Sequence, residues 1–235
     1  MQQPDIICAY LMMECHLGRT VGPLAEPPLP RLQCSPLGAV PKKSSDKWCL
    51  ILHLSYPEGS SINDGIPPDD FRLHYISVDT AIKHILALGH SCSLAKFDIK
   101  STFRLVPVHP DDWELLGMQW NNSYYFDTVL PFGLRITPFL FNQIANGLEW
   151  TLKSHSIPVL LHYLDGFLII AQTHDFCGAY LQLATTLCIR LGVPLVNDKT
   201  KGPATLLTFL RISIKLDILP WTYVSLRKSS PVWWL

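Results

Sequence analysis

Two aspartates at the ends of apolar segments are the residues of this chain best placed to do chemistry. Asp98 ends the run SLAKFD (93–98), and Asp165 interrupts the run VLLHYLDGFLIIA (159–171). The second run is rich in branched apolar residues and the first is an apolar segment, so both read as buried strands that present an acid at one end. Carboxylates that converge from separate strands can hold divalent cations between an attacking and a leaving oxygen, so the pattern points to phosphoryl transfer.

The elements around these aspartates can be predicted from local patterns. The second run predicts a β-hairpin with Asp165 at its tip, because Asp-Gly (165–166) is a favoured type I′ turn dipeptide. After Asp98 a short helix is expected over 99–103, and Asp98 taken alone could equally be the N-cap of that helix. Longer helical patterns cover residues 5–18, 77–88, 138–152 and 175–191. In the third of these helices, packing is expected for Phe139, Ile144, Leu148 and Trp150.

Two further hairpins are predicted between these helices. Residues 40–54 read as two strands joined by a Lys-Ser-Ser-Asp turn. Residues 118–126 read as a hairpin with Asn121-Asn122 at its turn.

In order and spacing these segments resemble the fingers and palm of a reverse transcriptase, and among these enzymes they are most similar to those of DIRS-type tyrosine-recombinase retrotransposons. FDIKSTF (97–103) is similar to the first catalytic motif of the family, LPFGLRITP (130–138) to its template-side motif and YLDG (163–166) to its second carboxylate motif. The resemblance implies an α+β fold with right-hand polymerase-like fingers and palm, in which helices back an antiparallel palm sheet.

The resemblance also implies a domain organisation. Residues 1–34 would form an N-terminal helix and a proline-rich arm, and residues 35–216 the reverse transcriptase-like domain, with fingers at about 35–76 and 111–137 and palm at about 77–110 and 138–216. Residues 217–235 lack the periodicity and caps of a helix, so the thumb of the family is expected to be missing. A frameshift near 217–220 is our hypothesis for this aberrant tail.

The resemblance assigns roles to individual residues. Asp98, Asp165 and the backbone carbonyl of Ile99 would bind Mg²⁺ or Mn²⁺, and Lys199 would lie near the pyrophosphate and could donate a proton to it. Contacts to nucleotide or template would come from Lys42, Lys43, Lys47, Phe103, Phe132, Gly133, Gln143 and Tyr163.

Each of these roles has an ordinary structural alternative. Phe103 would exclude a ribose 2′-OH, but an aromatic at its position also suits a core. Gly133 would allow close approach of a template base or nucleotide, but a turn glycine would look the same. The lysine-rich turn at 42–47 and Lys199 could also be simply solvated.

Three departures from the family pattern predict impaired chemistry. Gly166 stands where the family has a second aspartate, Cys49 where it has a phosphate-binding arginine, and Arg211 where it has a glycine. Losing one carboxylate should weaken Mg²⁺ binding, and cysteine cannot replace the donor fork of arginine. An active chain would bind an RNA or DNA template–primer duplex and dNTP. The alternative is a non-catalytic remnant that binds nucleic acid or a protein, whose identity the sequence does not indicate.

Composition limits the possible classes of protein only loosely. The 235 residues carry a net charge of +0, so a basic groove would have to be local, for example where Lys96, Lys100 and Arg104 flank Asp98. An odd number of cysteines, seven, favours a reducing compartment. With no signal-peptide pattern and no apolar run long enough for a membrane span, an intracellular protein, cytoplasmic or nuclear rather than secreted, is expected.

Overall fold

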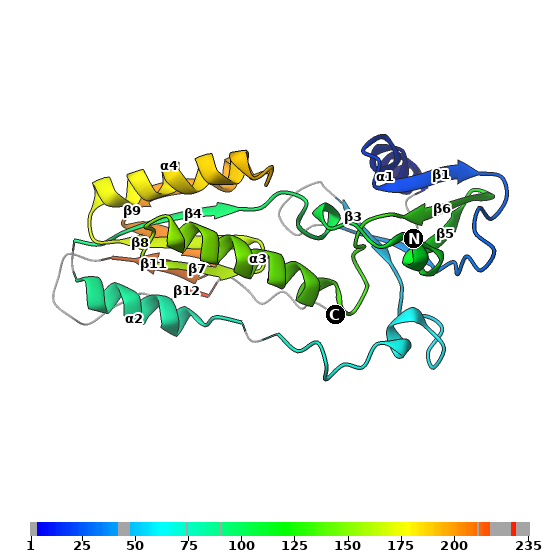
Figure 1. Cartoon of the computed structure of the whole chain (residues 1–235), viewed down its shortest axis with the longest axis horizontal. Coiled ribbons are helices and arrows are strands. Elements are labelled where there is room, and N and C mark those ends of the chain that lie inside the picture. The colour runs from blue at the N-terminus through cyan, green and yellow to red at the C-terminus, as the bar shows by residue number, and fades with distance from the viewer. Residues whose placement is uncertain are drawn as a thin grey trace. The chain divides into compact units, whose positions relative to one another are not determined.

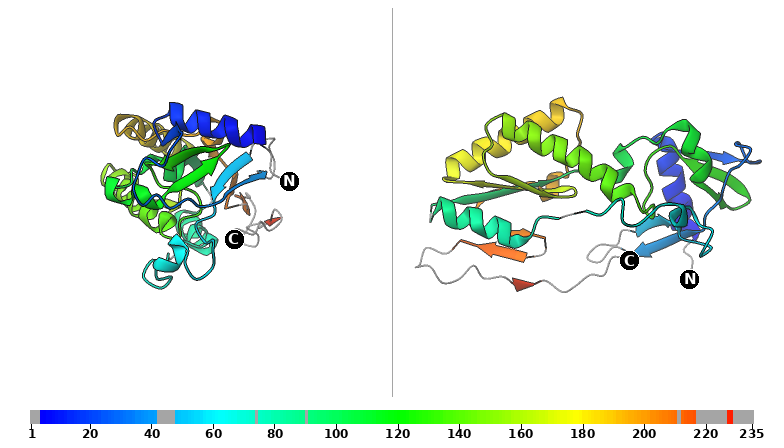
Figure 2. Two further views of the ribbon diagram at one scale, coloured as in Figure 1. Left: turned by 90° about the vertical axis from the view of Figure 1, so that its right-hand side faces the viewer. Right: turned by 60° about the horizontal axis from the view of Figure 1, so that its bottom comes forward.

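The structure is a computed structural model that describes residues 4–41, 48–73, 75–89, 91–210, 212–216 and 227–228. The chain forms two compact units (Figures 1 and 2). Unit 1 comprises Met1–Leu73 and Ser101–Phe141, and unit 2 comprises His74–Lys100 and Asn142–Leu235.

Unit 1 combines one helix, several short 3₁₀ turns and two antiparallel sheets. Its elements are α1 (Pro4–His16), β1 (Thr20–Leu24), β2 (Leu37–Pro41), β3 (Trp48–Leu52), η1 (Ile62–Gly65), η2 (Thr102–Leu105), η3 (Pro110–Leu115), β5 (Gly117–Trp120) and β6 (Ser123–Asp127). The sheets have the orders β1-β6-β5 and β2-β3. The predicted Asn-Asn hairpin turn is confirmed, since Asn121 and Asn122 have φ of 48° and 58° between β5 and β6.

The core of unit 1 joins its N-terminal helix to both sheets. Ile7 and Leu11 on α1 are at most 2% exposed and pack in one cluster with Leu50 and Leu52 of β3 and Met118 of β5. This burial, rather than intrinsic helix propensity, stabilises a helix of only 13 residues. The helix is therefore part of the unit's core.

Unit 2 is built on a four-stranded antiparallel sheet. Its elements are α2 (Val78–Leu88), β4 (Ser93–Asp98), β7 (Leu160–Tyr163), β8 (Gly166–Ala171), α4 (His174–Arg190), η4 (Asn197–Lys199), β9 (Lys201–Ala204), β10 (Leu206–Phe209), β11 (Ile212–Lys215) and β12 (Arg227–Lys228). The main sheet has the order β7-β8-β4-β9, and a smaller one has the order β10-β11-β12. Helix α3 (Thr137–Ser154) contributes its residues from Asn142 onward to unit 2.

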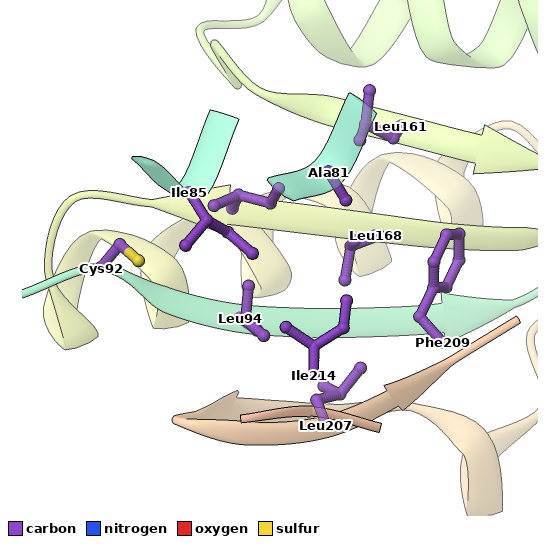
Figure 3. Close-up of a cluster of buried hydrophobic side chains, with 10 residues drawn as sticks. Ala81, Ile85, Cys92, Leu94, Leu161, Leu168, Leu207, Phe209 and Ile214 are labelled. Atoms are coloured by element: carbon purple, nitrogen blue, oxygen red, sulfur yellow. The ribbon is translucent and has the colours of Figure 1, made fainter. Parts of the chain in front are cut away.

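Helices cover both faces of the main sheet of unit 2. Helix α4 contacts β4, β8 and β9, and α2 contacts β8 from the opposite face (Figures 1 and 2). On the α2 side, Ala81 and Ile85 pack on Leu94 of β4 and Leu168 of β8, and Phe209 of β10 joins them (Figure 3). Sliding β4 by one residue would put Ser93 or Ala95 in the place of Leu94 and leave part of this cluster unfilled, so the packing favours the observed register.

Several local predictions are wrong, each for a structural reason. Asp98 is no helix N-cap, because Ile99 forms an antiparallel bridge with Leu195 and the next helical turn starts only at Thr102. On α3 Leu148 is buried as expected, but Ile144 and Trp150 are 48% and 72% exposed, because they lie off the face that packs.

Some predictions fall outside the described residues. These are the turn lysines Lys42, Lys43 and Lys47, the Arg211 position and residues 217–235 apart from the two of β12. Within the described part of the chain, the helices are too short or too polar to cross a bilayer.

Candidate active site

The strand register of unit 2 brings the two predicted catalytic aspartates to the same end of the sheet. Asp98 pairs with Gly166 across β4 and β8, and the Ile99 N–H donates to the carbonyl of Asp165 at 2.9 Å. Asp98 and Gly166 therefore form a non-hydrogen-bonded pair, in which Cα atoms are about 4.5 Å apart. Asp165 precedes Gly166 directly, so its backbone lies beside that of Asp98.

The hairpin that carries Asp165 turns one residue earlier than its sequence suggests. Tyr163 pairs with Gly166, so the two loop residues are Leu164 and Asp165, and Leu164 adopts the left-handed φ of 50°. The predicted Asp-Gly type I′ turn is wrong because Gly166 is paired on both sides, with β7 and with Asp98 of β4. Asp165 is thus presented at the tip, and Gly166 is a strand residue.

Gly166 has room for a side chain. Its φ lies outside the range that favours glycine, and a Cβ there would meet the carbonyl oxygen of Tyr163 at 3.7 Å and the ring of Phe209 at 3.8 Å, both ordinary contacts. Residues paired across antiparallel strands project on the same face, so an aspartate at this position would stand beside Asp98. The fold itself does not require glycine here.

Lys199 lies directly on the first aspartate. Its Nζ is 2.8 Å from Asp98 Oδ2, with side chains 55% and 17% exposed. The backbone holds η4 in place, since the Val196 N–H donates to the Asp98 carbonyl at 2.9 Å. Partial burial lowers the pKa of Lys199, but the hydrogen bond to Asp98 and the charges of Asp98 and Asp165 outweigh it and raise the pKa above its usual value. Lys199 therefore remains a cation beside both carboxylates.

The donor set fits a hard divalent cation, although it is small. Asp98, Asp165 and the backbone of Ile99 offer oxygen ligands, which Mg²⁺ and Mn²⁺ prefer. Within the described ranges, no group of three or more His, Cys, Asp or Glu side chains could hold a metal. Mg²⁺ in phosphoryl-transfer sites commonly uses one or two carboxylates together with substrate phosphates, so two carboxylates remain compatible with it.

Tyr163, a predicted binding residue, forms an aromatic pair that the sequence did not reveal. Its ring stacks on that of Tyr75 with centroids 4.4 Å apart, and Tyr75 is 43% exposed. Partial burial raises the pKa of Tyr75, and the nearby Tyr163 raises it further. Gln143, the other predicted contact in unit 2, is exposed on α3.

Unit 1 contains the predicted sugar-contacting aromatic in a ring cluster. The Phe103 ring lies 5.0 Å from that of Phe132 and 5.8 Å from that of Phe141. Phe103 and Phe132 are both half-buried, so each keeps part of its surface for a ligand.

The neighbouring Gly133 is required by packing within unit 1. It has φ of 114°, and a Cβ there would lie 2.0 Å from the carbonyl oxygen of Leu52. The Leu52 N–H in turn donates to the Phe132 carbonyl at 3.1 Å. Contact with β3 is thus sufficient reason for a glycine at this position.

Arg104 does not contribute to a basic surface around Asp98, contrary to expectation. It is 5% exposed, and its guanidinium donates to both carboxylate oxygens of Asp127 and to Glu14 and Thr20. Burial alone would lower the pKa of Arg104, but Asp127 and Glu14 raise it, so the group stays charged. The three partners were missed because they are 23 to 90 residues away in sequence.

A family model described as "Reverse transcriptase (RNA-dependent DNA polymerase)" matches residues 42–214. The chain belongs to the reverse transcriptase family. The matched part of the chain includes both aspartates, the Phe103 cluster and Lys199.

The chain is also similar to a viral polyprotein in sequence and to solved structures in fold. Polyprotein P3 of Commelina yellow mottle virus is 26% identical over 154 residues, which are 65% of this chain and 8% of the polyprotein. A foamy viral protease-reverse transcriptase in complex with double-stranded DNA superposes with a TM-score of 0.72 at 20% identity over 92% of this chain and 34% of its own. A foamy viral protease-reverse transcriptase in complex with an RNA/DNA hybrid gives 0.66 at 19% identity over 91% and 26%.

These similarities confirm the predicted fold, an α+β arrangement of the reverse transcriptase type. The chain spans about a third or less of each of these two solved structures and a small part of the polyprotein. The DIRS-type affiliation and the missing thumb stay predictions.

Proposed function

We propose that this domain carries out template-directed DNA synthesis by metal-assisted nucleotidyl transfer, at a rate reduced by the loss of the carboxylate at Gly166. In this proposal unit 1 is the fingers and unit 2 the palm, and the ligands are dNTP and an RNA or DNA template–primer duplex. The observation that carries it is the register of β4 and β8, which pairs Asp98 with the residue next to Asp165.

Side chains of both units would bind the metal ion, the nucleotide and the template. Asp98, Asp165 and the Ile99 carbonyl would hold Mg²⁺ or Mn²⁺, which when bound would stabilise the charge that develops on the attacking and leaving oxygens. Lys199 would exchange its contact with Asp98 for one with the pyrophosphate. Phe103 would pack against the sugar, with Phe132 behind it, and Tyr163, Gln143 and Gly133 would face nucleotide or template.

A non-catalytic role is the second candidate, and two observations favour it. Gly166 supplies no ligand although its position has room for one. Lys199 already neutralises Asp98 at 2.8 Å. A domain with these properties would still present Tyr75 and Tyr163 for base stacking and could bind nucleic acid without chemistry, or bind a protein partner.

Primer extension on an RNA template separates the two candidates. The purified chain would be compared with Gly166→Asp, Asp98→Asn and the control Asp175→Asn, whose side chain is fully exposed at the start of α4. We expect slow extension by the unchanged chain and by the control, faster extension by Gly166→Asp, and none by Asp98→Asn.

Other results of this assay would refute the role of Asp98 or favour the non-catalytic candidate. Extension by Asp98→Asn as fast as by the unchanged chain would refute the assignment of Asp98. No extension by any folded variant, together with hybrid binding that falls steeply with salt concentration, would favour the non-catalytic role, because phosphate contacts release counterions.

A further inference from the structure

We propose that Arg104 is a positioning residue for Phe103, and that the N-terminal segment Pro4–Leu24 sets the Phe103 ring through it. This inference rests on the proposed function, in which Phe103 contacts the sugar of the nucleotide. It gives the segment, which precedes the residues matched by the family model, a part in substrate selection.

Phe103 and Arg104 are consecutive residues of the four-residue turn η2. Side chains in a 3₁₀ turn are about 120° apart around the axis, so clamping one of them fixes the rotation that the other must follow. Phe103 is half-buried in its ring cluster, whereas Arg104 is 5% exposed. The side of η2 that carries Phe103 therefore keeps an exposed surface for the nucleotide, and the side that carries Arg104 is anchored in the protein.

The backbone at the start of η2 is strained. Ser101 and Thr102 have backbone φ angles of 62° and 27°, in a region that residues other than glycine rarely adopt. Such conformations persist only where surrounding contacts hold them. The Arg104 guanidinium supplies contacts of this kind two residues beyond the strained segment.

The anchor is a fork of charge-assisted hydrogen bonds. Arg104 Nη1 and Nη2 donate to the two carboxylate oxygens of Asp127 at 2.6 and 2.9 Å, and Nε donates to Glu14 at 2.9 Å. Thr20 accepts from Nη2 at 3.2 Å and donates to Asp127 at 2.6 Å. All four residues are at most 5% exposed. A lysine cannot reproduce this planar fork.

Two of the three partners belong to the N-terminal segment. Glu14 lies on α1, which is embedded in the core of unit 1, and Thr20 lies on β1 in register with Asp127 of β6. A displacement of α1 or β1 is thus transmitted to η2 through the guanidinium.

A fluorine probe tests the inference without nucleotide or catalysis. 4-Fluorophenylalanine would be placed at position 103 of the full chain, and in a second sample at position 176 of α4 in unit 2. Fluorine NMR spectra would be compared for the unchanged chain, Glu14→Gln, Thr20→Val, Arg104→Lys and the control Glu26→Gln. Glu26 is exposed beyond β1.

We expect Glu14→Gln, Thr20→Val and Arg104→Lys each to shift or split the signal at 103 by more than its linewidth, with the signal at 176 and the helical circular dichroism unchanged. Glu26→Gln should leave both signals in place. An unchanged signal at 103 in folded Glu14→Gln and Thr20→Val would overturn the inference, even if Arg104→Lys does not fold.

A functional measurement then distinguishes the inference from the proposal on which it rests. In the Gly166→Asp background, Glu14→Gln should raise the ratio of ribonucleotide to deoxyribonucleotide incorporation about threefold or more, whereas Glu26→Gln should not. An unchanged ratio with a shifted signal at 103 would overturn the role in selection. Absence of all extension would instead refute the proposed function, and the fluorine result would still decide the structural link.

Discussion

Glu149 on α3 supports the strand that leads to Asp165, and removing its charge should destabilise the protein in a pH-dependent way. Its carboxylate accepts from His162 Nδ1 and from Lys153 Nζ, each at 2.5 Å. His162 lies on β7, is 7% exposed and stacks on Phe167 at 5.2 Å. The contact therefore ties α3 to the hairpin of the candidate site.

The magnitude follows from these contacts. A hydrogen bond to a charged group contributes about 1.5–3 kcal/mol and a neutral one about 1 kcal/mol, so Glu149→Gln should cost about 1 kcal/mol at neutral pH. Glu149→Ala leaves the buried His162 without this acceptor and should cost about 2–3 kcal/mol. The matched control Lys153→Gln removes only a partly exposed pair one helical turn away and should cost about 0.3–0.5 kcal/mol.

The pH dependence has a definite sign. Partial burial raises the pKa of Glu149, but the hydrogen bonds from His162 and Lys153 outweigh it, so the folded pKa lies below its ordinary value of 4.5. The stabilisation is therefore complete above 4.5 and is lost as the pH falls through the folded pKa. The gap between the unchanged chain and Glu149→Gln should shrink in this acid range.

Urea denaturation at a series of pH values measures this gap directly. Equal stability of the unchanged chain and Glu149→Gln at neutral pH would refute the contact. A gap that widens below 4.5 would refute the sign of the pKa shift.

Three further predictions concern the candidate site and its support. Gly133→Ala should destabilise the chain by at least about 1–3 kcal/mol in urea denaturation, because φ of 114° is strained for alanine and Leu52 must also move, whereas the exposed Gly147→Ala should not destabilise it. Gly166→Asp should lower the melting temperature in the absence of metal, because the carboxylates at positions 98 and 166 would repel each other at about 5 Å. Mn²⁺ should reverse this loss, and a melting curve insensitive to Mn²⁺ would contradict the proposed geometry. Lys199→Gln should strengthen Mn²⁺ binding measured by calorimetry, since it frees Asp98 from the competing ammonium, and unchanged or weaker binding would show that Lys199 does not compete.

Local patterns in the sequence predict much of unit 2. The strands that lead to Asp98 and Asp165 are predicted because their apolar residues are buried on both faces, where helices pack. Helix α2 is predicted because its apolar spacing, Ser77 and Gly89 all agree, and the structure places these two residues at its caps. Such signals lie within one element and need no knowledge of the rest of the chain.

Features that depend on distant partners could not be predicted. Gly166 looked like a turn residue, but pairing with β4 as well as β7 makes it a strand residue and moves the positive φ to Leu164. Arg104 looked like a surface cation beside an acidic motif, but Glu14 and Asp127 bury it. In each case the deciding contact comes from an element that the local sequence does not specify.

Direct Mn²⁺ binding is the most immediate test of the central claim that Asp98 and Asp165 hold the cation of a polymerase site. Electron paramagnetic resonance counts bound Mn²⁺ in the unchanged chain, Asp98→Asn, Asp165→Asn and the exposed control Asp175→Asn. We expect one weakly bound ion, which either site substitution removes and the control retains. Binding that survives both site substitutions would contradict the claim.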